Sequence, residues 1–214
     1  MSEVRTFRPE AMKRGEVYQL LNRLIVPRPI AFVASLSAEG IANLAPFSYF
    51  NAGGANPPSL CFSVLYDREG KPKDTLVNIR ATREYTVNIV SRALAEGMNV
   101  ASAEWPAEVD EFERAGLTKA PSLRVAPPRV EEAPATFECR LHLIVPHGDG
   151  PVSAHYVIGE VVAAHVKESV LDEAGLPDAA KLDVIGRMGG DSYVQAGRDA
   201  LFEMARPVSP EKRG

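Results

Sequence analysis

The hydrophobic residues of this chain fall mainly into short runs, rich in β-branched and aromatic side chains, that are typical of β-strands. The segment Ser37-Ala38-Glu39-Gly40 separates two of these runs and ends in glycine, which predicts a turn between paired strands. The predicted strands are residues 30–36, the segment from Ile41 onward, residues 60–65 and residues 85–90.

Two later segments predict strands of different character. Residues 136–145 alternate between hydrophobic and polar side chains, which indicates one buried face and one face that is solvated or functional. Residues 155–166 are almost continuously apolar, which predicts a strand covered on both sides, in the core or at a subunit contact. Gly159 lies within this run, where we expect a bulge or a close backbone approach.

Helical spacing is confined to a few short segments, which are residues 10–24, 73–80 and 92–103. For the second of these we expect Asp74 or Thr75 to cap the helix by accepting hydrogen bonds from first-turn N–H groups. The acidic residues at 108–113 predict a solvated excursion of helix and loop.

Many strands, few short helices and no regular βαβ alternation predict an antiparallel β-barrel with helical insertions. We interpret residues 1–214 as a single domain without internal repeats. The tail at 206–214 is charged and contains two prolines, so we expect it to be loosely ordered.

Composition narrows the possible partners. The net charge is −4 and 45% of the 214 residues are hydrophobic, so the chain lacks the basic excess of nucleic-acid-binding proteins. It shows neither a signal peptide nor a long uninterrupted apolar stretch, so we expect a cytoplasmic protein that does not span a membrane. Cys61 and Cys139 lack redox or zinc spacing, and we expect both to be reduced, small buried hydrophobes.

Common catalytic motifs are missing from the sequence. It contains no GxSxG elbow, no Cys-His signature of hydrolases and neither of the two common nucleotide fingerprints. The four histidines lack the spacing of metal ligands, so we expect no dedicated metal site.

Two segments remain as candidate sites. Residues 43–51 mix polar and aromatic side chains before a Gly-Gly and Pro-Pro loop, as in a strand that lines a cavity or in an ordinary strand and turn. Lys73 and Thr75 lie at a predicted helix start, where free N–H groups and the helix dipole can bind phosphate, and Asn78 shares that helix face. The alternative is a plain helix cap with a solvated lysine.

Taken in order, these motifs resemble the flavin reductase-like family of FMN-binding split β-barrels. The resemblance extends from about Tyr18 to Tyr193, and it is specific because many weak motifs occur in the same order and spacing. The matching segments are residues 28–33, 43–51, 56–58, 73–79, 112–118, 128–130, 137–139, 158–162 and 186–190.

The resemblance implies a mainly β, six-stranded Greek-key split barrel that forms a homodimer, with FMN near the subunit interface. It implies that the flavin ring or ribityl chain contacts Asn43, Ala45, Pro46 and Ser48, and that the phosphate is held by Ser63, Lys73, Thr75 and Asn78. Asp74 is interpreted as a helix cap, because a carboxylate repels a phosphate. Arg187 would add a cation.

One motif departs from the family. Its reductases carry Gly-Asp-His before the late strand, with the histidine near the nicotinamide, whereas this chain has Ser153-Ala154-His155. His155 is therefore the candidate catalytic residue. The alternative is that it begins a strand with its ring at the surface.

The activity implied is NAD(P)H-dependent reduction of FMN, with electrons passed to an acceptor or to a partner monooxygenase. NADH or NADPH would be the co-substrate. Three alternatives stay open: a flavoprotein that acts directly on an organic substrate, an FMN-binding electron carrier or flavin store without a nicotinamide site, and a barrel that binds no flavin.

Overall fold

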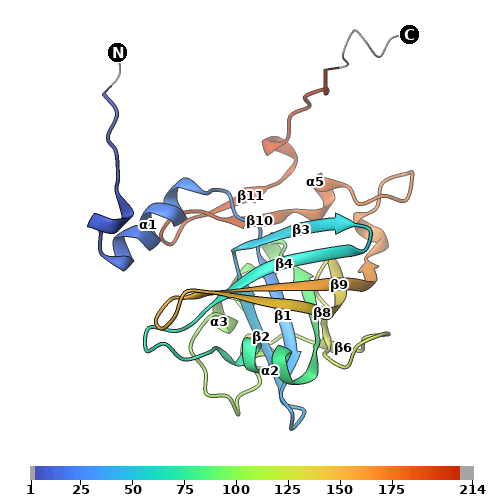
Figure 1. Ribbon diagram of the computed structural model, residues 1–214. Helices are drawn as coiled ribbons and strands as arrows, with labels where there is room; N and C mark the ends of the chain where they lie inside the picture. Colours follow the sequence, from blue (N-terminus) through green and yellow to red (C-terminus); the bar gives the residue numbers. More distant parts are fainter. Residues whose placement is uncertain (1–2, 208–214) are drawn as a thin grey trace.

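The structure is a computed structural model that describes residues 3–207 (Figure 1). One seven-stranded antiparallel sheet, in the order β2-β1-β5-β8-β9-β4-β3, forms its centre. The strands are β1 (Ala31–Leu36), β2 (Ala42–Phe47), β3 (Phe50–Ala55), β4 (Pro58–Leu65), β5 (Glu84–Ile89), β8 (Ala135–His147) and β9 (Ala154–Val166). The predicted mainly β, antiparallel architecture is confirmed.

Helices are short and lie at the ends and edges of the sheet (Figure 1). They are α1 (Arg14–Leu24), α2 (Asp74–Thr82), α3 (Ala95–Ala101), α4 (Glu111–Ala115) and α5 (Ala179–Leu182), with 3-10 turns at Pro9–Ala11, Arg92–Leu94, Glu168–Val170 and Arg198–Ala200. Two small hairpins pair β6 (Lys119–Ala120) with β7 (Arg129–Val130) and β10 (Val184–Arg187) with β11 (Tyr193–Ala196).

The sheet curls until strands from its two ends meet. Phe47 of β2 packs against Phe62 of β4, with ring centroids 5.4 Å apart, although four strands separate β2 from β4 in the sheet order. Leu76 and Ile79 of α2 pack into the same apolar interior. The other buried members of this barrel core are Ala31, Val33, Leu60, Val64, Tyr85, Val87, Cys139, Leu141 and Val157.

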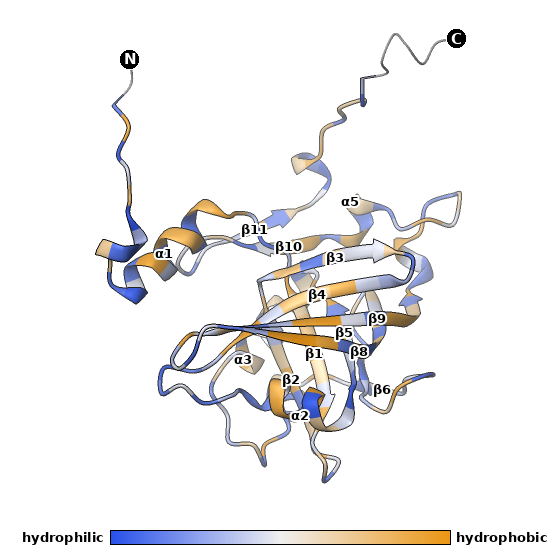
Figure 2. Cartoon of the chain, viewed as in Figure 1, coloured by the Kyte–Doolittle hydropathy of each residue, from blue (hydrophilic) through white to orange (hydrophobic). Residues whose placement is uncertain are grey.

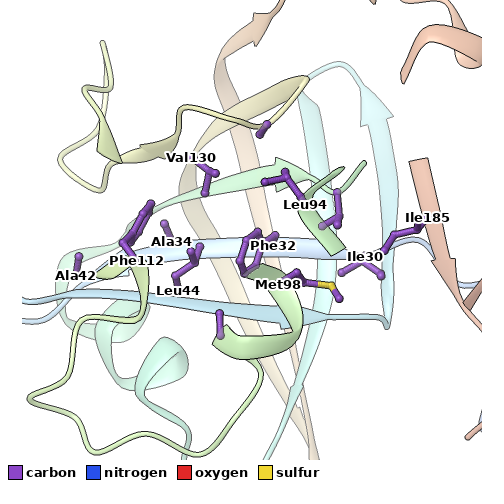
Figure 3. Packing of buried hydrophobic residues seen from close by; sticks show 13 residues of the cluster. Ile30, Phe32, Ala34, Ala42, Leu44, Leu94, Met98, Phe112, Val130 and Ile185 are labelled. Carbon is purple, nitrogen blue, oxygen red and sulfur yellow. The ribbon is translucent and has the colours of Figure 1, made fainter. Parts of the chain in front are cut away.

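A second core lies on the outer face of β1 and β2 (Figure 3). Phe32 of β1 packs there with Met98 of α3 and Phe112 of α4, while its neighbour Val33 belongs to the barrel core. Successive residues of a strand point to opposite faces, so β1 is buried on both sides and joins the two cores. This explains why its sequence is an uninterrupted apolar run.

The close backbone approach predicted at Gly159 is confirmed. A Cβ at this position would lie 2.0 Å from Tyr85 Oη and 3.0 Å from the carbonyl oxygen of Arg140. A side chain at this position would therefore collide with the hydroxyl end of Tyr85, which lies against β9 inside the barrel.

Two burial predictions are wrong. On β8, Glu138 is fully buried, because it accepts hydrogen bonds from the backbone of residues 123–125, which cover it. Leu143 and Val145 are 49% and 39% exposed, because a bulge at 141–143 shifts the register of β8 against β9. On β9, Tyr156 is 42% exposed, so the strand is covered on one side within this chain. A subunit contact over the other side stays a prediction.

The cysteines and the tail can be placed in part. Cys139 is buried, and burial raises the pKa of its thiol to about 12, whereas Cys61 is only half-buried. Residues 206–207 have no helix or strand, and the rest of the predicted tail, 208–214, lies outside the described residues. Within 3–207, no helix combines the length and the apolar character needed to cross a membrane.

Candidate functional site

A cavity of about 270 Å³ opens between β2, the loop before α2 and the segment that follows α3. Five of the candidate residues line it, which are Asn43, Ala45, Pro46, Lys73 and Thr75. The remaining lining residues include Phe47, Asp67, Lys71, Pro72, Asp74, Glu111 and the whole segment 101–105. The structure therefore brings strand β2 and the start of α2 together at one cavity, as both segments suggested separately.

A buried network of hydrogen bonds supports this wall. Asn43 is at its centre: its Oδ1 accepts from Thr75 Oγ1 at 2.7 Å and from Ser35 Oγ at 3.2 Å. Asn78 Nδ2 donates to Ser35 Oγ at 3.2 Å, which links α2 to β1. Asn43 Nδ2 donates to Glu111 Oε1 at 2.9 Å. All of these polar groups are partnered, as buried polar groups must be to avoid a desolvation cost.

Glu111 corrects the prediction that the acidic segment 108–113 is solvated. Its side chain is 5% exposed, and its Oε2 accepts from the backbone N–H of Leu44 at 3.0 Å. Burial raises the pKa of Glu111, and the N–H donors of Leu44 and Asn43 only partly oppose that shift. The segment folds inward because Phe112 packs beside it in the outer core.

The start of α2 also differs from prediction. Lys73 occupies the cap position, and neither Asp74 nor Thr75 accepts a capping hydrogen bond with its side chain. The Thr75 hydroxyl instead donates to Asn43, and burial raises the pKa of Asp74, with Glu108 adding to the effect. The N–H groups of Leu76 and Val77 bond to Lys73 O, so those of Asp74 and Thr75 are the donors left at the cavity.

The two lysines at this end are held differently. Lys71 Nζ lies 2.7 Å from Glu69 Oε2, and the loop is ordered by Asp67 Oδ1, which accepts from the N–H groups of Glu69 and Lys71 at 2.8 Å each. Lys73 forms no ion pair within the described chain. Lys73 is therefore the cation available to an anion at the start of α2.

Four candidates lie away from this cavity or face other partners. Ser48 Oγ accepts from Arg28 Nε at 3.3 Å, and Asn78 is committed to Ser35. Ser63 lines a separate, mostly apolar groove of about 640 Å³ beneath α1. Arg187 lines a third cavity, of about 770 Å³, between α3 and the β10–β11 hairpin, and bonds there to Tyr193 Oη and Gly190 O.

His155 lies inside the protein. It is 3% exposed and its ring stacks on Tyr66 with centroids 4.1 Å apart, so the alternative that places it at the surface is wrong. Burial lowers the pKa of His155, and Arg80 lowers it further. The residue does not line the cavity, and a role at a nicotinamide stays a prediction.

Sequence reasoning missed Trp105 and Glu111 as site residues. Trp105 lines the cavity, its Nε1 donates to Val100 O at 3.1 Å, and the Arg114 guanidinium lies 5.2 Å from its ring centroid. It is the sole tryptophan of the chain, which was the available signal. No local pattern marks Glu111 as buried. Among residues 3–207, no group of three potential ligands is placed to hold a metal.

Comparison with known proteins assigns the family. The sequence of residues 22–181 matches the family described as the flavin reductase like domain. An uncharacterized protein of Aquifex aeolicus is 42% identical over 180 residues, which cover 84% of this chain and 90% of that protein.

Two solved structures are similar throughout. Nitrilotriacetate monooxygenase component B from Bacillus cereus has a TM-score of 0.89 at 34% identity, covering 95% of this chain and 100% of that one. Pseudomonas fluorescens 2-nitrobenzoate 2-nitroreductase NbaA has a TM-score of 0.81 at 30% identity, covering 96% of both chains. With its split-barrel fold and a family match over most of its length, this chain belongs to the flavin reductase-like family.

Proposed function

We propose that this protein binds FMN in the cavity at the start of α2 and uses NADH or NADPH to reduce it. The observation that carries the proposal is the meeting of an unpaired lysine and a helix N-terminus with a strand of small and amide side chains. Lys73 and the α2 N–H groups form one end of the cavity, and Asn43, Ala45 and Pro46 form its β2 wall.

The residues present fit the cofactor. A helix N-terminus with free N–H groups and an adjacent cation is a site for phosphate. Ala45 and Pro46 leave the β2 backbone accessible, and Trp105 offers an aromatic surface across the cavity. We propose that Lys73 and the start of α2 hold the phosphate, and that the β2 wall contacts the ribityl chain or ring.

The chemistry of electron transfer is supplied by FMN, which when bound accepts a hydride from a reduced nicotinamide and passes the electrons on. The chain has to orient and enclose its ligands, so it needs no nucleophile. Asn43 is held by three hydrogen-bond partners, Ser35, Thr75 and Glu111, and is suited to that task.

The likeness to a monooxygenase component B supports a reductase that delivers electrons to a partner monooxygenase. The likeness to a nitroreductase favours a second candidate, a flavoprotein that reduces an organic substrate directly. An electron carrier or flavin store without a nicotinamide site is the remaining alternative.

We further propose a homodimer in the cytoplasm. Apolar side chains at the end of α1 support a contact with a second copy: Leu24 and the next residue, Ile25, are 70% and 59% exposed, and the helix lies beside the β10–β11 hairpin (Figures 1 and 2).

Anaerobic absorbance spectroscopy tests the proposal. FMN is added to the purified protein, followed by NADH or NADPH in separate samples. Rapid bleaching of the flavin band supports a reductase and reports its nicotinamide preference. Flavin that binds but stays oxidised favours the carrier, and flavin that does not bind contradicts the proposal.

A further inference from the structure

Glu111 is a buried carboxylate at the wall of the cavity, and its two oxygens reach two different parts of β2. Oε1 accepts from the Asn43 side chain at 2.9 Å and Oε2 accepts from the Leu44 backbone at 3.0 Å. It comes from α4, 68 residues along the chain from Asn43. The contact therefore ties an outer helix to the strand that lines the cavity.

Glu111 determines which end of the Asn43 amide is nitrogen. An ionised carboxylate can only accept hydrogen bonds, so it requires the NH₂ group of Asn43 to face it. The other partners of Asn43 are the hydroxyls of Thr75 and Ser35, and a hydroxyl can donate or accept. Without the carboxylate, both orientations of the amide would satisfy those hydroxyls.

We propose that Glu111 is a positioning residue for flavin binding, which fixes the orientation of the Asn43 amide and holds the β2 backbone at Leu44. The inference rests on the proposed binding of FMN in this cavity. Asn43 and Leu44 both belong to β2, so the effect falls mainly on the ring or ribityl chain of the ligand, although Thr75, one partner of Asn43, lies at the start of α2. Loss of Glu111 should therefore change the affinities for FMN and riboflavin in a different pattern from loss of Lys73.

Titrations with FMN and with riboflavin distinguish the two residues. Glu111→Gln should weaken both flavins about tenfold, since they share the ring and the ribityl chain; this corresponds to about 1.4 kcal/mol. Lys73→Ala should weaken FMN only, because riboflavin has no phosphate. Glu113→Gln is the matched control: it removes the same charge from an exposed position of α4 and should leave both affinities unchanged.

A double-mutant cycle separates positioning from a general effect on stability. Because part of the effect of Glu111 passes through Asn43, the loss of flavin affinity in the variant with both Glu111→Gln and Asn43→Ala should be smaller than the sum of the two single losses. Losses that add, or a Glu111→Gln variant that binds both flavins like the wild type, would overturn the proposal.

The wild-type titration comes first and separates the two levels of the argument. If the wild type binds no flavin, the proposed function and this inference both fail; if it binds flavin while Glu111→Gln is neutral, only the inference fails. Should Glu111→Gln not fold, Asn43→Ala removes the other partner of the same hydrogen bond and is tested instead. Equal loss of FMN and riboflavin supports the proposal, and wild-type affinity for both overturns it.

Discussion

Glu111 and Glu138 are both buried, at 5% and 0% exposure, yet the protein treats them differently. Glu138 accepts from the backbone N–H groups of Leu123, Arg124 and Val125 at 2.7, 2.6 and 3.2 Å, and His165 Nε2 lies 2.6 Å from its Oε1. Glu111 accepts from two groups, Asn43 Nδ2 and Leu44 N.

The balance of desolvation and hydrogen bonding separates the two carboxyls. Desolvation would raise the pKa of Glu138, but its N–H donors and His165 outweigh it and the pKa is lowered. At Glu111 desolvation prevails, Asp74 adds repulsion, and the pKa is raised. The comparison teaches that the hydrogen-bond donors around a buried carboxylate determine its structural role. Glu138 binds the backbone of the loop at 123–125 and fixes that loop, whereas Glu111 binds Asn43 and Leu44 and holds strand β2 beside the cavity.

The largest expected effect comes from Glu138→Ala. It would leave three backbone N–H groups without their acceptor, at a cost of about 1–3 kcal/mol for each group that water cannot reach. We expect the free energy of unfolding to fall by about 3–5 kcal/mol in urea denaturation. Flavin affinity of the folded fraction should not change, and a selective loss of affinity with normal stability would contradict the assignment of Glu138 as a clamp.

Lys73→Ala should instead lower the affinity for FMN and leave the stability of the fold unchanged. Loss of a charge-assisted hydrogen bond should weaken FMN binding by about 1–3 kcal/mol in a fluorescence titration. Stability should be unaffected, because the side chain makes no ion pair within residues 3–207. An unchanged FMN affinity would mean that the phosphate binds elsewhere.

His165→Gln is expected to have a smaller effect than removal of its partner. The imidazole is only partly buried and supplies one of the four contacts of Glu138, so its loss should cost about 1 kcal/mol of unfolding free energy. Thermal denaturation measures this. A loss as large as that of Glu138→Ala would show that the histidine, not the backbone donors, holds the carboxylate.

The smallest expected effect is one of pH, and its sign differs between the two glutamates. A lowered folded pKa gives Glu138 a stabilising contribution above the unfolded value of about 4.5, which is lost as the pH falls through the folded pKa. A raised folded pKa makes Glu111 a cost at neutral pH that is relieved as the pH falls toward 4.5.

Urea denaturation across pH 3 to 7 measures both contributions. The advantage of the wild type over Glu138→Gln should shrink as the pH falls below about 4.5. Its stability relative to Glu111→Gln should instead rise as the pH falls toward that value. Shifts of the same sign would mean that the two carboxyls do not differ in the way their donors suggest.

The sequence predicted those features that depend on neighbouring residues. The apolar run of β1, the glycine within β9 and the lysine at the start of α2 are local signals, and the structure places each as expected. The burial of Glu111 and Glu138 depends on acceptors meeting N–H groups from distant segments, and no spacing reveals that. The exposure of Leu143 follows from the bulge at 141–143, which reverses an alternation that would otherwise continue along β8.

The network around Asn43 also has a consequence for how the protein persists in a cell. Its bonds join residues 32, 43 and 68 positions apart, so the cavity wall exists only after the barrel has closed. A flavin that binds there stabilises the closed chain alone, by about 2.7 kcal/mol at a hundred times its dissociation constant. Supply of the ligand would then govern how much of the protein survives proteolysis, and flavin-starved cells would lose the polypeptide together with its activity.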